Sequence, residues 1–193
     1  MTAAFDGRFT PRVKKARLAA ALAAVPPEAR VLDIGCGLTD LAGRLPSYVG
    51  CDRNPVILGE NRRRFPGVVF LEWDVGVAEP PESLVGSGPF DAVLMLALLE
   101  HLADPAAALR RGAFLLAPGG RLVVTTPHPL GRWPLEIGAA LGWLSTHAAG
   151  EHETLLGRRD LEAAGKQADL ELREYRRFLF GLNQLVVFER DEK

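Results

Sequence analysis

The sequence contains little cysteine, almost no net charge and no long apolar run. Only two cysteines occur among the 193 residues, which excludes a disulfide scaffold as the basis of the fold. Lysine and arginine number 23, aspartate and glutamate 24, and the net charge is −1. This balance offers no basic excess for nucleic acid or for an anionic membrane surface. We therefore expect a cytoplasmic protein with reduced thiols and with no nucleic-acid or membrane partner.

Targeting, membrane and metal signals are also missing. Residues 1–9 lack the apolar stretch of a signal peptide, and the apolar run at residues 18–25 is too short to span a bilayer. No spacing of Cys, His and Asp is typical of a metal site. The length suits one well-packed domain and is short for two, so we expect residues 1–193 to form a single domain.

What is present is an alternation of short β-rich apolar runs with helical patterns. Strands are expected at residues 30–34, 48–51, 68–73, 90–96 and 121–126, and helices at 11–25, 40–45, 55–65, 105–116 and 159–164. Such alternation is typical of βαβ units and predicts a mostly parallel sheet. Two further runs, 170–178 and 184–190, are joined by Gly181-Leu182-Asn183 and predict an antiparallel hairpin. The expected fold class is α/β, a Rossmann-like doubly wound sheet of seven strands.

The first expected strand breaks into a glycine-containing segment, Asp33-Ile34-Gly35-Cys36-Gly37. Glycines let the backbone approach a ligand, and ligands of doubly wound sheets bind at this edge. Asp33 lies inside the otherwise apolar end of the first strand, where an unpaired carboxylate is costly, so we expect it to have a partner. Asp52 and Asp74 end the next two strands, and an acid in the place of Asp52 can accept both hydroxyls of a ribose. A tight turn or an N-cap would explain each feature alone, but together they predict a nucleoside site.

Asp40 occupies the position of the third glycine in a dinucleotide fingerprint. A carboxylate at the beginning of a helix would repel a diphosphate and would suit a cationic ligand. This position favours a sulfonium or ammonium ligand over NAD. An NAD-dependent oxidoreductase is further disfavoured because the sequence has no Tyr-x-x-x-Lys pair.

The sequence resembles the class I S-adenosylmethionine-dependent methyltransferases, closely over residues 29–127. The matching segments are VLDIGCG (31–37), Asp52, Asp74-Val75, FDAVLMLALLEHL (90–102) and LLAPGGRLVVTTP (115–127). The resemblance implies S-adenosyl-L-methionine as cofactor and S-adenosyl-L-homocysteine as product. From the compact size, the near-neutral charge and an apolar insertion after the fifth strand, we expect a small-molecule methyl acceptor, such as a sugar, lipid or polyketide-like metabolite. A non-catalytic, regulatory protein that retains the cofactor pocket is the alternative.

The resemblance also implies the positions that bind the cofactor. They are Asp33, Gly35, Cys36, Gly37, Asp52, Arg53, Asp74, Val75, Leu96 and Ala97. By position, the glycine segment would face the methionine part and Asp33 its ammonium group. Asp52 would hold the ribose hydroxyls, Asp74 and the Val75 amide would meet the adenine, and the residues after the fourth strand would lie near the methyl group.

Candidates for the acceptor pocket are His101, His128 and Trp133. His101 lies in a segment that the family uses mainly to begin a helix. His128 follows the fifth strand, where either a pocket role or a hydrogen bond within the loop is possible. Trp133 belongs to an expected substrate-side insertion at about residues 127–157, which would cover the pocket or pack on the core. No catalytic residue is assigned, since methyl transfer from a sulfonium does not require a dedicated base.

Overall fold

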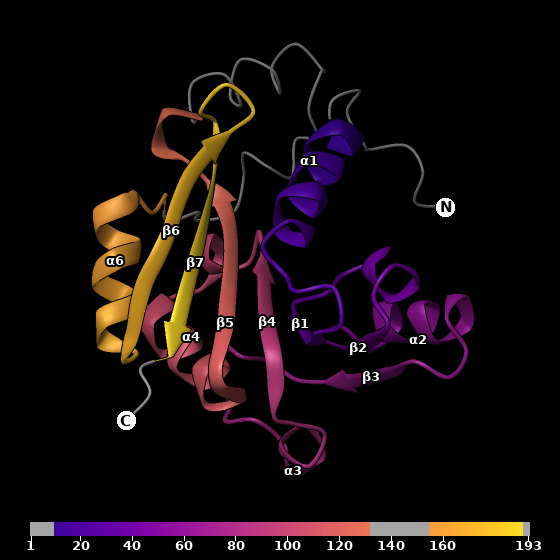
Figure 1. The fold of residues 1–193 in the computed structure, drawn as a ribbon. Coiled ribbons are helices and arrows are strands. Elements are labelled where there is room, and N and C mark those ends of the chain that lie inside the picture. The colour runs from indigo at the N-terminus through magenta and orange to yellow at the C-terminus, as the bar shows by residue number, and fades with distance from the viewer. Residues whose placement is uncertain (1–9, 132–154, 191–193) are drawn as a thin grey trace.

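Seven strands form one sheet in the order β3-β2-β1-β4-β5-β7-β6 in the computed structural model, which describes residues 10–131 and 155–190 (Figure 1). The strands are β1 (Arg30–Ile34), β2 (Ser47–Asp52), β3 (Val69–Glu72), β4 (Phe90–Leu96), β5 (Leu116–Pro127), β6 (Leu170–Phe178) and β7 (Asn183–Arg190). Neighbouring strands among β1 to β5 are parallel, whereas β7 is antiparallel to both β5 and β6. The expected Rossmann-like α/β sheet with a C-terminal antiparallel hairpin is confirmed.

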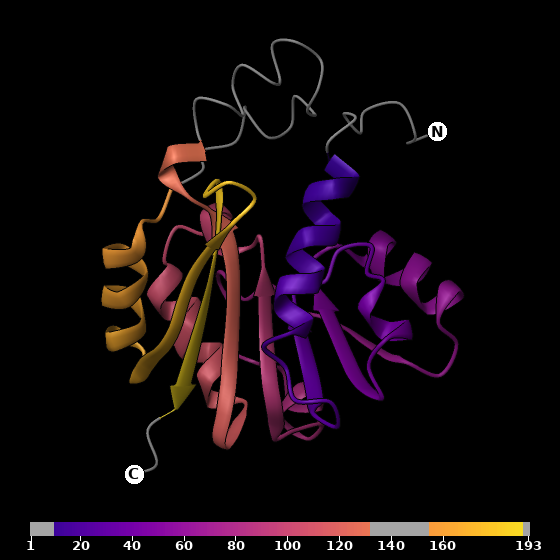
Figure 2. The same ribbon diagram turned by 45° about the horizontal axis from the view of Figure 1, so that its top comes forward.

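Helices cover both faces of this sheet (Figures 1 and 2). They are α1 (Thr10–Leu22), α2 (Pro55–Arg64), α3 (Glu82–Val85), α4 (Pro105–Phe114) and α6 (Arg158–Gln167), with 3-10 turns η1 (Leu41–Gly43), η2 (Leu99–His101) and η3 (Pro129–Gly131). Helices α1 and α2 pack on one face, and α4 and α6 on the other. Asn54 and Asp104 cap α2 and α4, each with a proline in the first turn.

The alternation of side chains along β1 places Asp33 on the α1 face. Val31 packs in the cluster that contains α1 and α2, whereas Leu32 and Ile34 pack in the cluster that contains α4 and α6. Successive residues of a strand point to opposite faces, so Asp33 points to the same face as Val31. The carboxylate is thereby directed to the side of the sheet on which α1 lies.

Several expected boundaries were wrong. Strand β5 begins at Leu116 because this residue pairs with Phe90 across an irregularity in register, so Pro118-Gly119-Gly120 lies within the strand. Residues 75–89, where neither a helix nor a strand was expected, contain the one-turn helix α3, and the expected helix at 40–45 is the single turn η1. Trp133 and most of the expected insertion lie outside the described residues. Within the described parts of the chain, no helix is both long and apolar enough to cross a membrane.

Candidate functional site

A cavity of about 270 Å³ lies where β1 and β4 end. Strand order reverses between these two neighbours, and crevices in doubly wound sheets form at such a point. The cavity is lined by these predicted cofactor positions: Asp33, Gly35, Cys36, Leu96 and Ala97. Helix α1 supplies another wall, which includes Lys14 and Arg17. The structure therefore brings these five positions together around one hollow, whereas Gly37, also predicted on the methionine side, does not line it.

The glycine loop, residues 35–40, depends on backbone conformations that favour glycine. Gly35 has φ +70° and Gly37 has φ +53°, both in the left-handed region. A Cβ on Gly35 would lie 2.8 Å from Leu98 Cδ1, so the loop and the segment after β4 are in close contact. The Cys36 amide donates to the Cys51 carbonyl at 2.9 Å, which ties the loop to β2. Both cysteines are free thiols.

Asp33 has the partner that the sequence required. The Tyr48 hydroxyl donates to Asp33 Oδ2 at 2.8 Å, and the aspartate is only 3% exposed. Burial raises the pKa of Asp33 to about 7, although the Tyr48 hydrogen bond opposes the shift. Because Asp33 lines the cavity and its hydrogen-bond partner is neutral, a cationic ligand group would stabilise its charged form.

We expect Asp33→Asn to flatten the pH dependence of stability. The folded-state pKa lies above that of the unfolded chain, so the folded protein binds the extra proton and loses stability as pH rises from about 4 to about 7. Asparagine keeps the shape and cannot ionise. Urea unfolding gives the free energy of unfolding at pH 5 and at pH 8. Between these two pH values it should fall by more than about 1 kcal/mol further in the wild type than in the variant. Equal decreases would contradict the shifted pKa.

Asp52 organises the backbone at the edge of the sheet. Its Oδ2 accepts from the Gly37 amide and its Oδ1 from the Asn54 amide, each at 2.9 Å. Its carbonyl accepts from the Trp73 amide at 3.1 Å, which links the end of β2 to the segment after β3. Carboxylate oxygens have further lone pairs, so these contacts leave acceptor capacity for ribose hydroxyls. The neighbouring Arg53 is exposed and does not line the cavity.

Asp74 and Val75 lie outside the cavity, after β3 and beside the segment that carries Asp52. Asp74 Oδ1 accepts from the Gly76 amide at 2.9 Å, which closes a tight turn. Val75 is buried, and its carbonyl accepts from Arg111 Nη1 at 2.8 Å. The turn is thus fixed by its own hydrogen bond and by the contact with α4.

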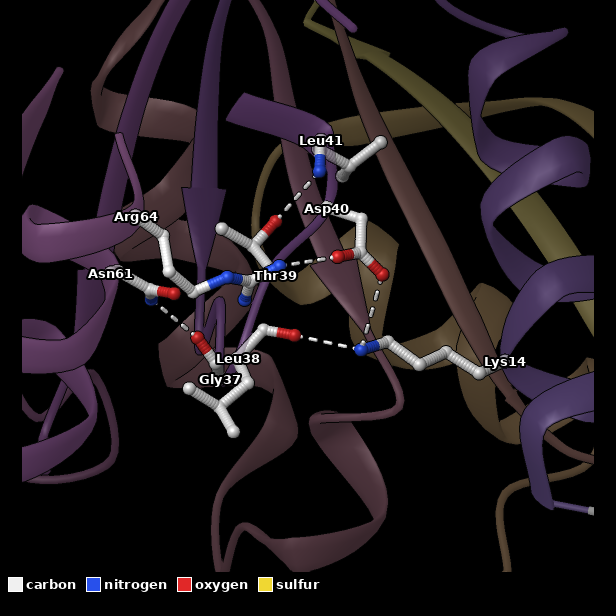
Figure 3. Close-up of polar contacts among 8 residues, drawn as sticks. All are labelled: Lys14, Gly37, Leu38, Thr39, Asp40, Leu41, Asn61 and Arg64. Atoms are coloured by element: carbon white, nitrogen blue, oxygen red, sulfur yellow. Dashed lines mark hydrogen bonds and ion pairs between the residues drawn. The ribbon is translucent and has the colours of Figure 1, made fainter. Parts of the chain in front are cut away.

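Asp40 is ion-paired, so the expectation that its charge would repel a diphosphate was wrong. Arg64 Nη2 lies 2.7 Å from Asp40 Oδ1, and Lys14 Nζ lies 3.6 Å from Oδ2 (Figure 3). The Arg64 hydrogen bond keeps the pKa of Asp40 below its ordinary value. With two cations beside it, this carboxylate is not the isolated negative charge that would repel a diphosphate. The charge of Asp40 therefore no longer distinguishes between the two cofactors.

The two described acceptor-pocket candidates do not line this cavity. His101 is exposed on η2. His128 Nδ1 accepts from the Leu130 amide at 3.1 Å, and the His128 amide donates to the Leu182 carbonyl at 2.9 Å. Burial, with Arg177 nearby, lowers the pKa of His128, which favours the neutral ring that accepts this hydrogen bond. Of its two expected roles, the structure shows the hydrogen bond within the loop.

Sequence reasoning missed three charged residues near this end of the sheet. Lys14 and Arg17 were not among the predicted site residues, yet their i, i+3 spacing places them on one face of α1, and this face lines the cavity. Glu100 follows β4, is 2% exposed, and its Oε2 has no hydrogen-bond partner among the described residues. Burial raises the pKa of Glu100, and the charge of Arg17 opposes the shift.

Comparisons with known proteins agree with this architecture. A trans-aconitate 2-methyltransferase of Methylobacterium nodulans is 40% identical over 117 residues, which cover 56% of this chain and 43% of that protein. A ubiquinone biosynthesis O-methyltransferase of Caulobacter sp. is 38% identical over 102 residues, 50% of this chain and 40% of that protein. The chain thus spans less than half the length of these relatives.

A solved structure and a family model extend the likeness over most of the chain. The crystal structure of an S-adenosylmethionine-dependent methyltransferase from Mesorhizobium loti superposes with a TM-score of 0.73, covering 91% of this chain and 98% of that one. Its 19% sequence identity makes it evidence for the fold. The model of a methyltransferase-domain family matches residues 7–175. The chain therefore belongs to this family of methyltransferase domains, as the sequence motifs indicated.

Proposed function

We propose that the protein is an S-adenosylmethionine-dependent methyltransferase that acts on a small molecule. The observation that carries the proposal is the cavity at the switch point of the sheet, bounded by the glycine loop and by the buried Asp33. A desolvated carboxylate with a neutral partner suits the ammonium group of the methionine part. The close approach of Gly35 to Leu98 shows a loop in which glycine is required.

We assign the cofactor contacts along the edge of the sheet. Asp33 would accept from the ammonium group, and the glycine loop would face the methionine chain. Asp52 would accept from the ribose hydroxyls while still holding Gly37, and the turn at Asp74-Val75 would meet the adenine. Each acid lies close to the C-terminal end of a strand at this edge, which supports one continuous binding surface.

The bound cofactor would supply an electrophilic methyl group on its sulfonium. The chain's own contribution is to hold the two reactants in line and to exclude water. Leu96 and Ala97 line the cavity at the end of β4, and α1 forms its opposite wall. This arrangement supports catalysis by positioning, for which a dedicated base is not required.

The names of the relatives support a small-molecule acceptor, since one acts on trans-aconitate and one belongs to ubiquinone biosynthesis. We further propose that residues 1–193 act as one domain with a substrate-side insertion at about 127–157. The two free thiols support a cytoplasmic location.

A screen for homocysteine release tests the transferase activity. Purified protein, S-adenosylmethionine and hydrolase-coupled detection would be applied to carboxylic acids, phenols and sugars. We expect one class of acceptor to raise the rate at least tenfold above the rate without acceptor. If the cofactor binds and no class of acceptor is methylated, the non-catalytic alternative is favoured.

A further inference from the structure

Asn61, in the second half of α2, is a buried amide that the proposed function does not use. It is 0% exposed, and its Nδ2 donates to the Gly37 carbonyl at 2.7 Å. Its Oδ1 has no hydrogen-bond partner among the described residues. Leaving half of an amide unpaired in the interior is unfavourable, so stability alone does not explain an asparagine here. The contact that it does make is with the glycine loop.

Gly37 is held from both sides by hydrogen bonds. Its amide donates to Asp52 Oδ2 at 2.9 Å, and its carbonyl accepts from Asn61. Asp52 Oδ1 also accepts from the Asn54 amide, directly before α2. The glycine loop, the end of β2 and helix α2 are thus joined in a closed circuit of polar contacts. Arg64, one turn further along α2, holds Asp40 on the same loop (Figure 3).

Packing does not provide this constraint. A Cβ placed on Gly37 would meet no atom within 4 Å, and the φ of +53° lies in the left-handed region. On the side of the Cβ no atom packs against Gly37, so the hydrogen bonds from Asp52 and Asn61 are the contacts that hold this conformation. Asn61 is a buried residue of α2 and does not line the cavity, so it reaches the loop without occupying the space of a ligand.

We propose that Asn61 is a positioning residue for the cofactor: it fixes the Gly37 carbonyl and thereby the direction in which the glycine loop presents its backbone to the methionine part. This inference rests on the proposed function. Asn61 touches no ligand in this scheme and acts through Gly37. Its unpaired oxygen is then a tolerated cost of having an amide donor at this site.

The first test is Asn61→Leu, which keeps the size of the side chain and removes both the donor and the unpaired oxygen. We expect S-adenosylhomocysteine to bind about three- to tenfold more weakly, the worth of one hydrogen bond. The thermal midpoint of the ligand-free protein should change by less than about 3 °C, because apolar burial offsets the lost bond. Arg63→Ala, on the exposed face of the same helix, is the control and should bind as wild type does.

The second test is Asn61→Asp, which turns the donor into a titratable group. A protonated carboxyl can donate to the Gly37 carbonyl, whereas an ionised one repels it. The ionisable groups around residue 61 are Cys36 on the loop, Asp52 on β2 and Arg64 one turn along α2. Because Asp33 titrates in the wild type as well, the affinity of the variant is compared with that of the wild type at each pH. We expect affinity within threefold of wild type at pH 5.5 and at least tenfold weaker at pH 8.5. Asn61→Leu should show no such recovery.

Hydrogen exchange separates the inference from the proposed function. In the ligand-free protein the Gly37 amide should exchange at least threefold faster in Asn61→Leu than in wild type. Wild-type affinity and exchange in that variant would overturn the inference and leave the cofactor assignment intact. If wild type itself does not bind S-adenosylhomocysteine, the proposed function and the cofactor role of Asn61 both fail, whereas faster exchange would still show that Asn61 holds the loop.

Discussion

Asp52→Ala is expected to weaken the binding of S-adenosylhomocysteine by about 100-fold or more. Hydrogen bonds to a charged group contribute about 1.5–3 kcal/mol each, and the substitution would remove two such contacts with the ribose. It would also release the Gly37 amide from Oδ2 and so loosen the glycine loop. Isothermal titration calorimetry on the folded variant measures the loss.

The matched control is Glu72→Ala. Glu72 is the register partner of Asp52 on β3 and is exposed. Its replacement by alanine removes a carboxylate from the neighbouring strand and leaves the contacts of the glycine loop unchanged. Its affinity should stay within twofold of wild type. If Asp52→Ala binds as tightly as this control does, Asp52 has no ribose role.

Gly35→Ala is expected to destabilise the fold by about 2–5 kcal/mol. An L residue in the left-handed region costs about 1–2 kcal/mol, and overpacking adds about 1–3 kcal/mol. The added methyl group would lie 2.8 Å from Leu98 Cδ1, so either the loop or the segment after β4 must move. Urea unfolding of the ligand-free protein gives the free energy directly.

Gly37→Ala separates the two contributions, because its backbone is also left-handed while its Cβ would meet nothing within 4 Å. It should cost only the conformational part, about 1–2 kcal/mol. The double variant Gly35→Ala/Leu98→Ala should lose less free energy of unfolding than the sum of the losses in the two single variants. Strict additivity would show that the steric contact is unimportant.

The sequence predicted the parts of this site that follow from local pattern. Strand alternation places the ends of β1, β2 and β3 at one edge, and Asp33, Asp52 and Asp74 lie at or just after those ends. The cost of burying a carboxylate predicted that Asp33 has a partner, and Tyr48 is that partner. Such inferences require only the period of a strand and the position of a glycine.

Contacts between elements distant in the sequence could not be predicted in this way. Lys14 meets Leu38 and Asp40 across 24 or more residues, and Asn61 meets Gly37 across the same span. No local pattern signals either contact. Treating Asp40 as an unpaired charge failed for this reason, since its two cations come from α1 and α2. The cavity wall formed by α1 was missed because helical periodicity separates an apolar from a polar face without showing what the polar face contacts.

The central claim is that the glycine loop and Asp33 bind S-adenosylmethionine, and direct calorimetric titration tests it. Folded wild-type protein titrated with S-adenosylhomocysteine at pH 7.5 should give a one-to-one isotherm, and NADH should give no heat and no change in nicotinamide fluorescence. Saturable binding of NADH together with no binding of S-adenosylhomocysteine would contradict the account.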